Sequence, residues 1–171
     1  MGCDIHAFIE YAYDGETITN SFTDSELHIG RDYELFSLIA GVRGATSPIV
    51  SPRGFPDECI KNGDSSVFPS SWCCKEKFND YGVDAHSATW LTLDELKLVR
   101  ASYIKNNLEF SGSTDRSILA LSESKPAMNS IFTYTFGEYE NAGLYCSIVI
   151  MESLLKLCPT CKVRFVCWFD S

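Results

Sequence analysis

Strand-like segments at both ends of the chain enclose segments with a helical period. Residues 3–13 are rich in strand formers, and the Asp14-Gly15 pair after them is a hairpin turn signal. We therefore expect residues 17–22 to return as a partner strand. Residues 163–170 alternate between polar and apolar and predict a closing strand. The two terminal strands are expected to pair in one sheet.

Helical spacing of apolar residues marks the segments between these strands. Residues 32–41 have an apolar face, and Gly41 is placed to end that helix. Thr92 followed by Glu95 is a capping box, which predicts a helix from residue 93 to about residue 103. Two further helical stretches are expected at residues 126–139 and 142–157, although residues 132–136 in the first of them alternate like a strand.

Residues 42–84 keep no period and are rich in proline and glycine, so they predict a long irregular loop region. The length of 171 residues suits one domain. We therefore expect an α+β fold that forms a single globular domain over residues 1–171. Its mixed or antiparallel sheet would include both terminal strands, with about three to four helices packed against it.

The chain carries a net charge of −9, which disfavours binding to a nucleic-acid backbone and makes direct DNA binding unfavourable. A local basic pocket for a small phosphate-containing ligand remains compatible with this charge. No apolar run approaches the roughly 20 residues of a membrane span, and the first residues lack the basic start of a secretory signal. We expect a cytoplasmic location, with the eight cysteines reduced.

Cys158 and Cys161 have the spacing of half a zinc knuckle. A complete zinc site needs two further ligands. Cys73 and Cys74 are the nearest sulfur pair along the chain, but adjacent cysteines rarely chelate one ion together. The sequence therefore leaves a zinc site at Cys158 and Cys161 open.

The strongest chemical signal is a pair of Asp-x-His triplets in a chain with only three histidines: Asp4 with His6, and Asp84 with His86. Residues two apart on a strand point to the same face. If the triplets meet in one cleft, these four side chains could hold zinc or manganese and activate a water for hydrolysis. Alternatively, each aspartate orients its own histidine as a general base without a metal. Either histidine could also be purely structural.

Arginines on the Pro/Gly-rich loops are natural clamps for phosphate oxygens, and nearby aromatic rings could stack on a base. If the terminal strands are neighbours, Asp170 would also lie near Asp4 and His6. The expected ligand-binding side chains are Arg31, Tyr33, Arg43, Arg53, Ser87 and Trp90.

Several of these segments resemble a family of small proteins from bacteriophages and bacterial genomes. The resemblance is carried by Met-Gly-Cys-Asp-Ile-His at residues 1–6, by residues 31–36, 41–43 and 52–54, by residues 84–93, and by Trp-Phe-Asp at 168–170. No activity is established for that family, so it implies a single site without naming its chemistry. It also implies a phage-type accessory protein that counters host defence.

Three functions remain open at this point. The chain could be a metal-assisted phosphoester hydrolase that acts on a nucleotide. It could be a non-catalytic sponge that sequesters a nucleotide immune messenger, and such sponges often work as homo-oligomers. It could also be an acidic inhibitor that binds a host defence protein. We favour a nucleotide-handling pocket over the inhibitor, without separating enzyme from sponge.

Overall fold

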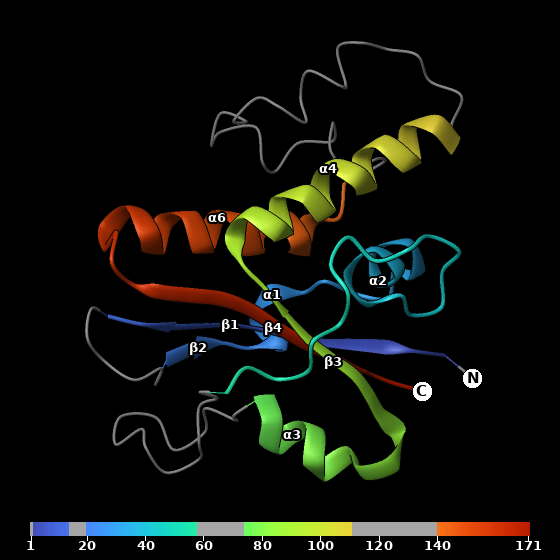
Figure 1. Ribbon diagram of the computed structural model, residues 1–171, viewed down its shortest axis with the longest axis horizontal. Helices are drawn as coiled ribbons and strands as arrows, with labels where there is room; N and C mark the ends of the chain where they lie inside the picture. The colour runs from blue at the N-terminus through green and yellow to red at the C-terminus, as the bar shows by residue number, and fades with distance from the viewer. Residues whose placement is uncertain (1, 14–19, 58–73, 111–139) are drawn as a thin grey trace.

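The computed structural model describes residues 2–13, 20–57, 74–110 and 140–171 (Figure 1). Its centre is a four-stranded antiparallel sheet with the strand order β2-β1-β4-β3. This confirms an α+β fold with a single domain and with both terminal strands in the sheet. The strands are β1 (Asp4–Ala12), β2 (Asn20–Phe22), β3 (Ala85–Leu91) and β4 (Lys162–Asp170).

The two terminal strands form the central pair of the sheet. β1 and β4 are paired along their whole length, from Asp4 opposite Asp170 to Ala12 opposite Lys162. β2 pairs antiparallel with β1, with Phe22 opposite Ile9, and the expected hairpin turn at residues 14–15 lies outside the described residues. β3 adds to the free side of β4. The end-to-end register of β1 and β4 brings the two ends of the described chain together (Figure 1).

The expected helices form where their caps predict them. Asp32 accepts a hydrogen bond from the backbone N–H of Leu35, and Gly41 ends the same helix with a φ of 69°. Thr92 and Glu95 form the reciprocal capping box. The helices are α1 (Asp24–Leu27), α2 (Tyr33–Ala40), α3 (Cys74–Tyr81), α4 (Leu93–Phe110) and α6 (Ala142–Leu157), with a 3-10 turn at Gly82–Asp84.

Two of these outcomes extend or limit the sequence predictions. α4 continues to Phe110, beyond the expected end near residue 103. The helix expected at residues 126–139 lies outside the described residues. None of the helices in the described part of the chain combines the length and apolarity that a bilayer crossing requires.

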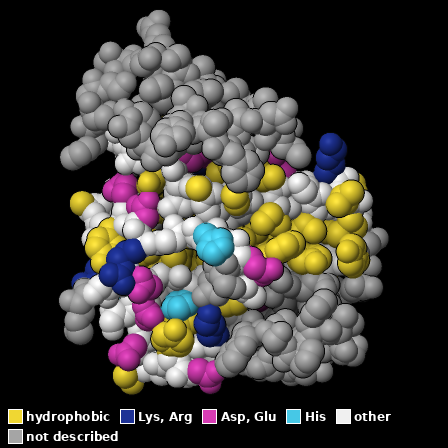
Figure 2. Space-filling view, turned by 180° about the vertical axis from the view of Figure 1, so that it is seen from behind, with side chains coloured by type: hydrophobic (Ala, Val, Ile, Leu, Met, Phe, Trp, Pro, Cys, Tyr) yellow, Lys and Arg dark blue, Asp and Glu magenta, His cyan; other side chains and the backbone are white. Residues whose placement is uncertain are grey.

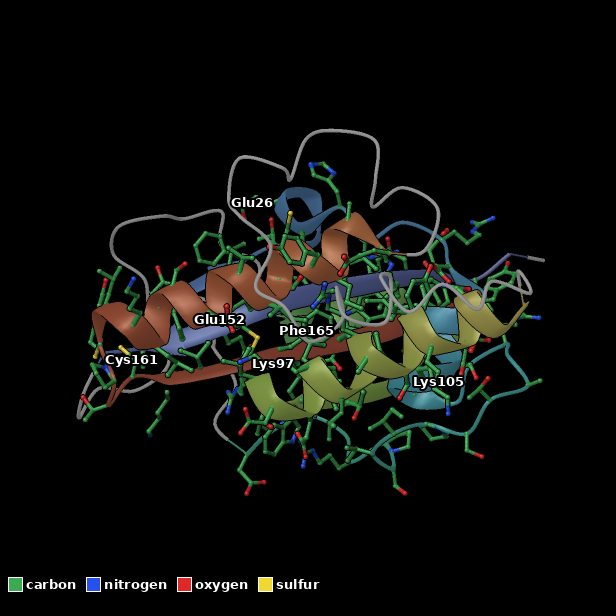
Figure 3. All side chains as sticks on the ribbon, turned by 90° about the horizontal axis from the view of Figure 1, so that it is seen from above. Glu26, Lys97, Lys105, Glu152, Cys161 and Phe165 are labelled. Carbon is green, nitrogen blue, oxygen red and sulfur yellow. The ribbon has the colours of Figure 1, made fainter. Side chains whose placement is uncertain are left out.

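The sheet separates two unlike layers. One face, which we call the helix face, carries Ala7, Ile9 and Phe169 and is covered by α2, α4 and α6 (Figure 1). Seen from above, α4 and α6 run on either side of β1 and β4, with Phe165 of β4 between the two helices (Figure 3). The opposite face, the α3 face, buries Phe8, Val166 and Trp168 under α3 and the loop that contains Phe55.

Two regular elements lie where the sequence analysis expected none. Residues 42–57 are irregular as predicted, but residues 74–81 form α3, so the loop region expected over 42–84 is too long. α3 has few apolar residues, which hides it from a periodicity search. β3 is also regular, but its ladder shifts between His86 and Thr89, where Ser87 adopts a φ of 52°. This bulge breaks the alternation that would have revealed the strand.

Candidate functional site

Three strands place chemically active side chains at one end of the sheet. Asp4 begins β1, Asp170 ends β4 and Ala85 begins β3, and both Asp4 and Ala85 are register partners of Asp170. Figure 2 shows acidic, basic and histidine side chains on the side of the molecule where Figure 1 marks the chain ends. We call the following side chains the chain-end cluster: Cys3, Asp4, His6, Arg31, Tyr33, Arg43 and Asp170.

A histidine–carboxylate contact lies at the centre of this cluster. His6 Nε2 is 3.2 Å from Asp170 Oδ2, and the backbone N–H of Asp4 donates to Asp170 Oδ1 over 3.1 Å. The side chains of His6 and Asp170 are only 11% and 22% exposed. A carboxylate that accepts from Nε2–H keeps the lone pair of the neutral ring on Nδ1. Asp170 therefore holds the orientation of His6.

Aromatic rings hold His6 in place from two sides. Its imidazole stacks on Trp168 with a centroid separation of 4.0 Å, and the Tyr81 ring lies 5.0 Å away. Trp168 is the residue opposite His6 in the β1–β4 register, whereas Tyr81 is supplied by the last residue of α3. The buried Nε1–H of Trp168 has no hydrogen-bond acceptor among the described residues. Both rings lie on the α3 face.

Arg31 and Asp4 form a two-pronged ion pair at the edge of the cluster. Arg31 Nε and Nη2 donate to the two carboxylate oxygens of Asp4 over 2.8 and 2.6 Å. These hydrogen bonds lower the pKa of Asp4 below its usual value. A Cβ at Gly2 would lie 2.5 Å from Arg31 Nη1, so the absence of a side chain there lets the guanidinium lie against the backbone. Asp4 shares a face with His6, as predicted, but its carboxylate binds Arg31.

Within the cluster, Tyr33 and Arg43 both contact Cys3. The backbone N–H of Cys3 donates to the Tyr33 hydroxyl oxygen over 3.4 Å. Burial raises the pKa of the Cys3 thiol, and the nearby Arg43 guanidinium offsets part of that rise. A raised pKa keeps the thiol protonated near neutral pH, and a protonated thiol is a poor nucleophile. The structure thus places Tyr33 and Arg43 beside Cys3, which belongs to the core of the helix face, and it places Arg31 beside Asp4.

His86 lies on the opposite face of the sheet from His6, so the expectation that the two imidazoles share a cleft is wrong. Ala85 is the register partner of Asp170, which places the next residue, His86, opposite Phe169. The His86 ring lies 6.3 Å from the Phe169 ring, which belongs to the helix face. A shift of one residue in register exchanges the two faces of a strand. The second Asp-x-His triplet is therefore out of phase with the first.

The neighbours of His86 also differ from the expected arrangement. His86 Nδ1 is 2.9 Å from the Ser87 hydroxyl, and that serine occupies the bulge of β3. Asp84 lies exposed in the 3-10 turn before the strand. The structure therefore groups neither Asp84 nor Ser87 with the chain-end cluster.

Arg53 and Trp90 form a separate structural contact. The Arg53 guanidinium lies 3.6 Å from the centroid of the Trp90 ring, and its Nε–H donates to the Trp90 carbonyl over 3.0 Å. Its Nη2 pairs with Glu95 in the first turn of α4. These contacts fasten the loop to α4 and engage the groups that were expected to clamp phosphate and stack on a base. The structure therefore places Arg53 and Trp90 in contact with each other, and within the described residues no hydrogen bond, ion pair or ring contact joins them to the chain-end cluster.

The expected metal ligands are not assembled in the described ranges. Asp4, His6, Asp84 and His86 cannot surround one ion while their imidazoles lie on opposite faces of the sheet. Across residues 2–13, 20–57, 74–110 and 140–171, no three His, Cys, Asp or Glu side chains are close enough to hold a metal. Cys158 and Cys161 therefore gain no third ligand from that part of the chain, and neither set fits zinc or manganese there.

No family model, curated protein or solved structure matches this chain. The resemblance of residues 1–6 to phage proteins stays a prediction, and the function has to be argued from the side chains themselves.

Sequence reasoning placed Asp170 near the site on the condition that the terminal strands pair, and the register confirms that placement. It missed Trp168 and Tyr81. Trp168 could have been predicted, because in an antiparallel pair with Asp4 opposite Asp170, His6 lies opposite Trp168. Tyr81 gave no comparable signal, since it enters through α3.

Proposed function

We propose that the chain-end cluster binds a phosphate-containing small molecule, and that His6 acts as a general base in the hydrolysis of its phosphoester. The observation that carries the proposal is the 3.2 Å contact between His6 Nε2 and Asp170 Oδ2. A histidine held by a carboxylate in a largely buried setting is a common arrangement for proton transfer near neutral pH. In the proposed step, water attacks phosphorus while its proton passes to the His6 imidazole, and Asp170 stabilises the imidazolium that forms. The ester P–O bond breaks, and the leaving oxygen takes a proton from solvent and departs as an alcohol.

The arginines supply the anion-binding half of the proposal. Arg31 donates hydrogen bonds to Asp4 from Nε and Nη2. Its half-exposed guanidinium also carries N–H donors at Nη1. Arg43 is exposed and approaches the cluster from the loop after α2. Both guanidiniums are suited to phosphate oxygens, and their charge would stabilise the negative transition state. No step in this mechanism requires a metal ion.

The aromatic residues near the general base, His6, guide the choice of substrate class. Tyr33 is 39% exposed and Tyr81 is 40% exposed, so each presents an aromatic surface on which a nucleobase could stack. Tyr81 also covers His6, so we expect its side chain to move aside when substrate enters. Nucleotide messengers of bacterial defence, hydrolysed in the cytoplasm of a bacterial host, are the first substrates to test, because of the resemblance to phage proteins.

The decisive experiment compares the two histidines. The full chain is incubated with a panel of cyclic and linear nucleotides, and products are separated by chromatography. We expect His6→Ala and Asp170→Asn to lower the rate by about 100- to 10,000-fold, with an unchanged circular dichroism spectrum. His86→Ala is the matched control, and it should keep the full rate because its ring lies on the helix face.

Two outcomes would overturn the proposal. Equal losses in His6→Ala and His86→Ala would mean that the Asp170 contact carries no special role. Stoichiometric binding of a nucleotide that is recovered unchanged after the protein is denatured would favour the sponge function over hydrolysis.

A further inference from the structure

A second group of reactive side chains lies at the other end of β4. Cys158 follows α6 and Cys161 precedes β4, in the turn between these two elements (Figure 3). The nine residues of β4 separate this turn from Asp170, a span of roughly 30 Å. The two cysteines are therefore remote from the chain-end cluster, and the proposed hydrolysis does not use them.

The turn holds the two cysteines at the spacing of a disulfide. The backbone N–H of Cys161 donates to the Cys158 carbonyl over 3.0 Å, which closes a β-turn with Pro159 and Thr160 at its corners. A β-turn keeps its first and last Cα atoms within about 7 Å, and disulfides join Cα atoms roughly 4.4–6.8 Å apart. Pro159 presets the backbone of this turn. Both side chains are thiols in this structure.

The two sulfurs differ in accessibility. Cys158 is half-buried, whereas Cys161 is only 8% exposed. This combination suits a pair in which Cys158 meets an incoming reagent and Cys161 completes the reaction from beneath.

We propose that Cys158 and Cys161 are a reversible redox pair that is oxidised by the disulfide of a small thiol. The Cys158 thiolate attacks one sulfur of that disulfide, which forms a mixed disulfide and releases one small thiol. The Cys161 thiolate then attacks the Cys158 sulfur, which closes the Cys158–Cys161 bond and releases the second small thiol. The two protein thiols lose two electrons and two protons, and both appear in the two small thiols.

The position of the pair on the helix sets the direction of this equilibrium. Cys158 caps the C-terminal end of α6, where the helix dipole is negative. A thiolate there is less stabilised than one at a helix N-terminus, so the reduced form gains little from ionisation. We therefore expect the equilibrium to favour the disulfide over the dithiol. The zinc alternative has weaker support, because the described residues offer no third ligand.

Trypsin allows a clean test on the full chain. Cleavage after Lys156 and Lys162 releases residues 157–162, a peptide whose only cysteines are these two. The protein is equilibrated with graded mixtures of reduced and oxidised glutathione, blocked with N-ethylmaleimide, digested and analysed by mass spectrometry. We expect the peptide to lose two hydrogens and carry no maleimide, in mixtures where exposed Cys146 still reacts with maleimide.

Single variants identify the attacking sulfur. Cys161→Ser should trap glutathione on Cys158, whereas Cys158→Ser should leave buried Cys161 largely free of glutathione. The measurement on the unaltered chain keeps the test valid if either variant fails to fold.

Three results would overturn the proposal. The first is two maleimides on the peptide throughout the range in which Cys146 becomes glutathionylated. The second is equal glutathione labelling of both single variants. The third is one zinc ion per purified chain that is lost in Cys158→Ser, because it would assign the pair to metal binding.

Discussion

The two faces of the sheet are built in opposite ways. On the helix face, a large cluster of fully buried apolar side chains is covered by α2, α4 and α6. On the α3 face, the described buried cluster consists of Phe8, Val166 and Trp168, covered by one eight-residue helix and a loop. The buried ionisable side chains His6 and Glu10 both lie on the α3 face. The larger apolar core therefore lies on the helix face, although that layer also contains a largely buried ion pair between Arg100 and Glu140.

The α3 face contains a buried carboxylate, that of Glu10. Its side chain is fully buried, and its Oε2 accepts from Arg164 Nε and Nη2 over 2.9 and 2.7 Å. Its second oxygen, Oε1, has no hydrogen-bond partner among the described residues. Burial raises the pKa of Glu10, and the Arg164 charge opposes that rise only in part. Buried carboxylates of this kind cost stability and are usually kept for a reason other than stability.

The largest effect should come from truncating one aromatic residue on each face. Phe36 is fully buried on the helix face, where its ring lies 5.1 Å from that of Phe169. Phe36→Ala should lower the free energy of unfolding by about 3–5 kcal/mol, because it leaves a cavity in a packed core. Phe78 on α3 is only partly buried, and Phe78→Ala should cost roughly 1 kcal/mol. Urea unfolding measures both, and equal losses would contradict the division between the faces.

A smaller loss is expected from separating the buried ion pair. Glu10→Ala should cost about 3 kcal/mol, because the largely buried Arg164 charge loses its ion pair with Glu10. The double variant Glu10→Leu with Arg164→Met should recover most of that loss, since both charges are then gone. Thermal and urea unfolding of the three proteins measures this difference. A double variant less stable than Glu10→Ala would show that the pair is a net source of stability.

The smallest effect belongs to the exposed ion pair of Asp4 and Arg31. Both side chains are about half exposed, at 51%, so Asp4→Asn should cost at most about 1 kcal/mol at neutral pH. The pKa of Asp4 is lowered in the folded protein, so its contribution is present above its ordinary value of 3.8. That contribution should vanish as the pH falls through the lower folded value. Unfolding curves at several pH values test this, and a variant equally destabilised at every pH would contradict it.

Much of the fold could be predicted because its main elements carry local signals. β1 and β4 are rich in strand formers, and α2 and α4 have caps that the sequence shows directly. β3 was not predicted because the bulge at Ser87 interrupts the alternation of faces along the strand. Ala88 and Trp90 therefore do not continue the alternation of the residues before the bulge. α3 escaped because it is held by tertiary contacts of Phe78 and Tyr81 rather than by an apolar stripe.

The candidate site was predictable only where it depended on one strand pair. Asp4 and His6 share a face because alternation along a strand is fixed, and Asp170 follows from the pairing of the terminal strands. The position of His86 depended on the register of β3, which no local pattern specifies. Arg53 and Trp90 looked like ligand-binding groups, because residue type alone does not reveal that they satisfy each other.

The place of β4 in the sheet has a consequence for how the chain is made. β4 lies between β1 and β3, yet it is the last of the four strands along the sequence. During synthesis, β1 and β3 therefore emerge before β4, and the edges that β4 will pair with have unsatisfied backbone hydrogen-bonding groups. Such unpaired edges can pair with other chains. The hydrogen bond between Asp4 and Asp170 spans 166 residues. Closing contacts of that length is slow, so this protein should depend on a chaperone more than its modest size suggests.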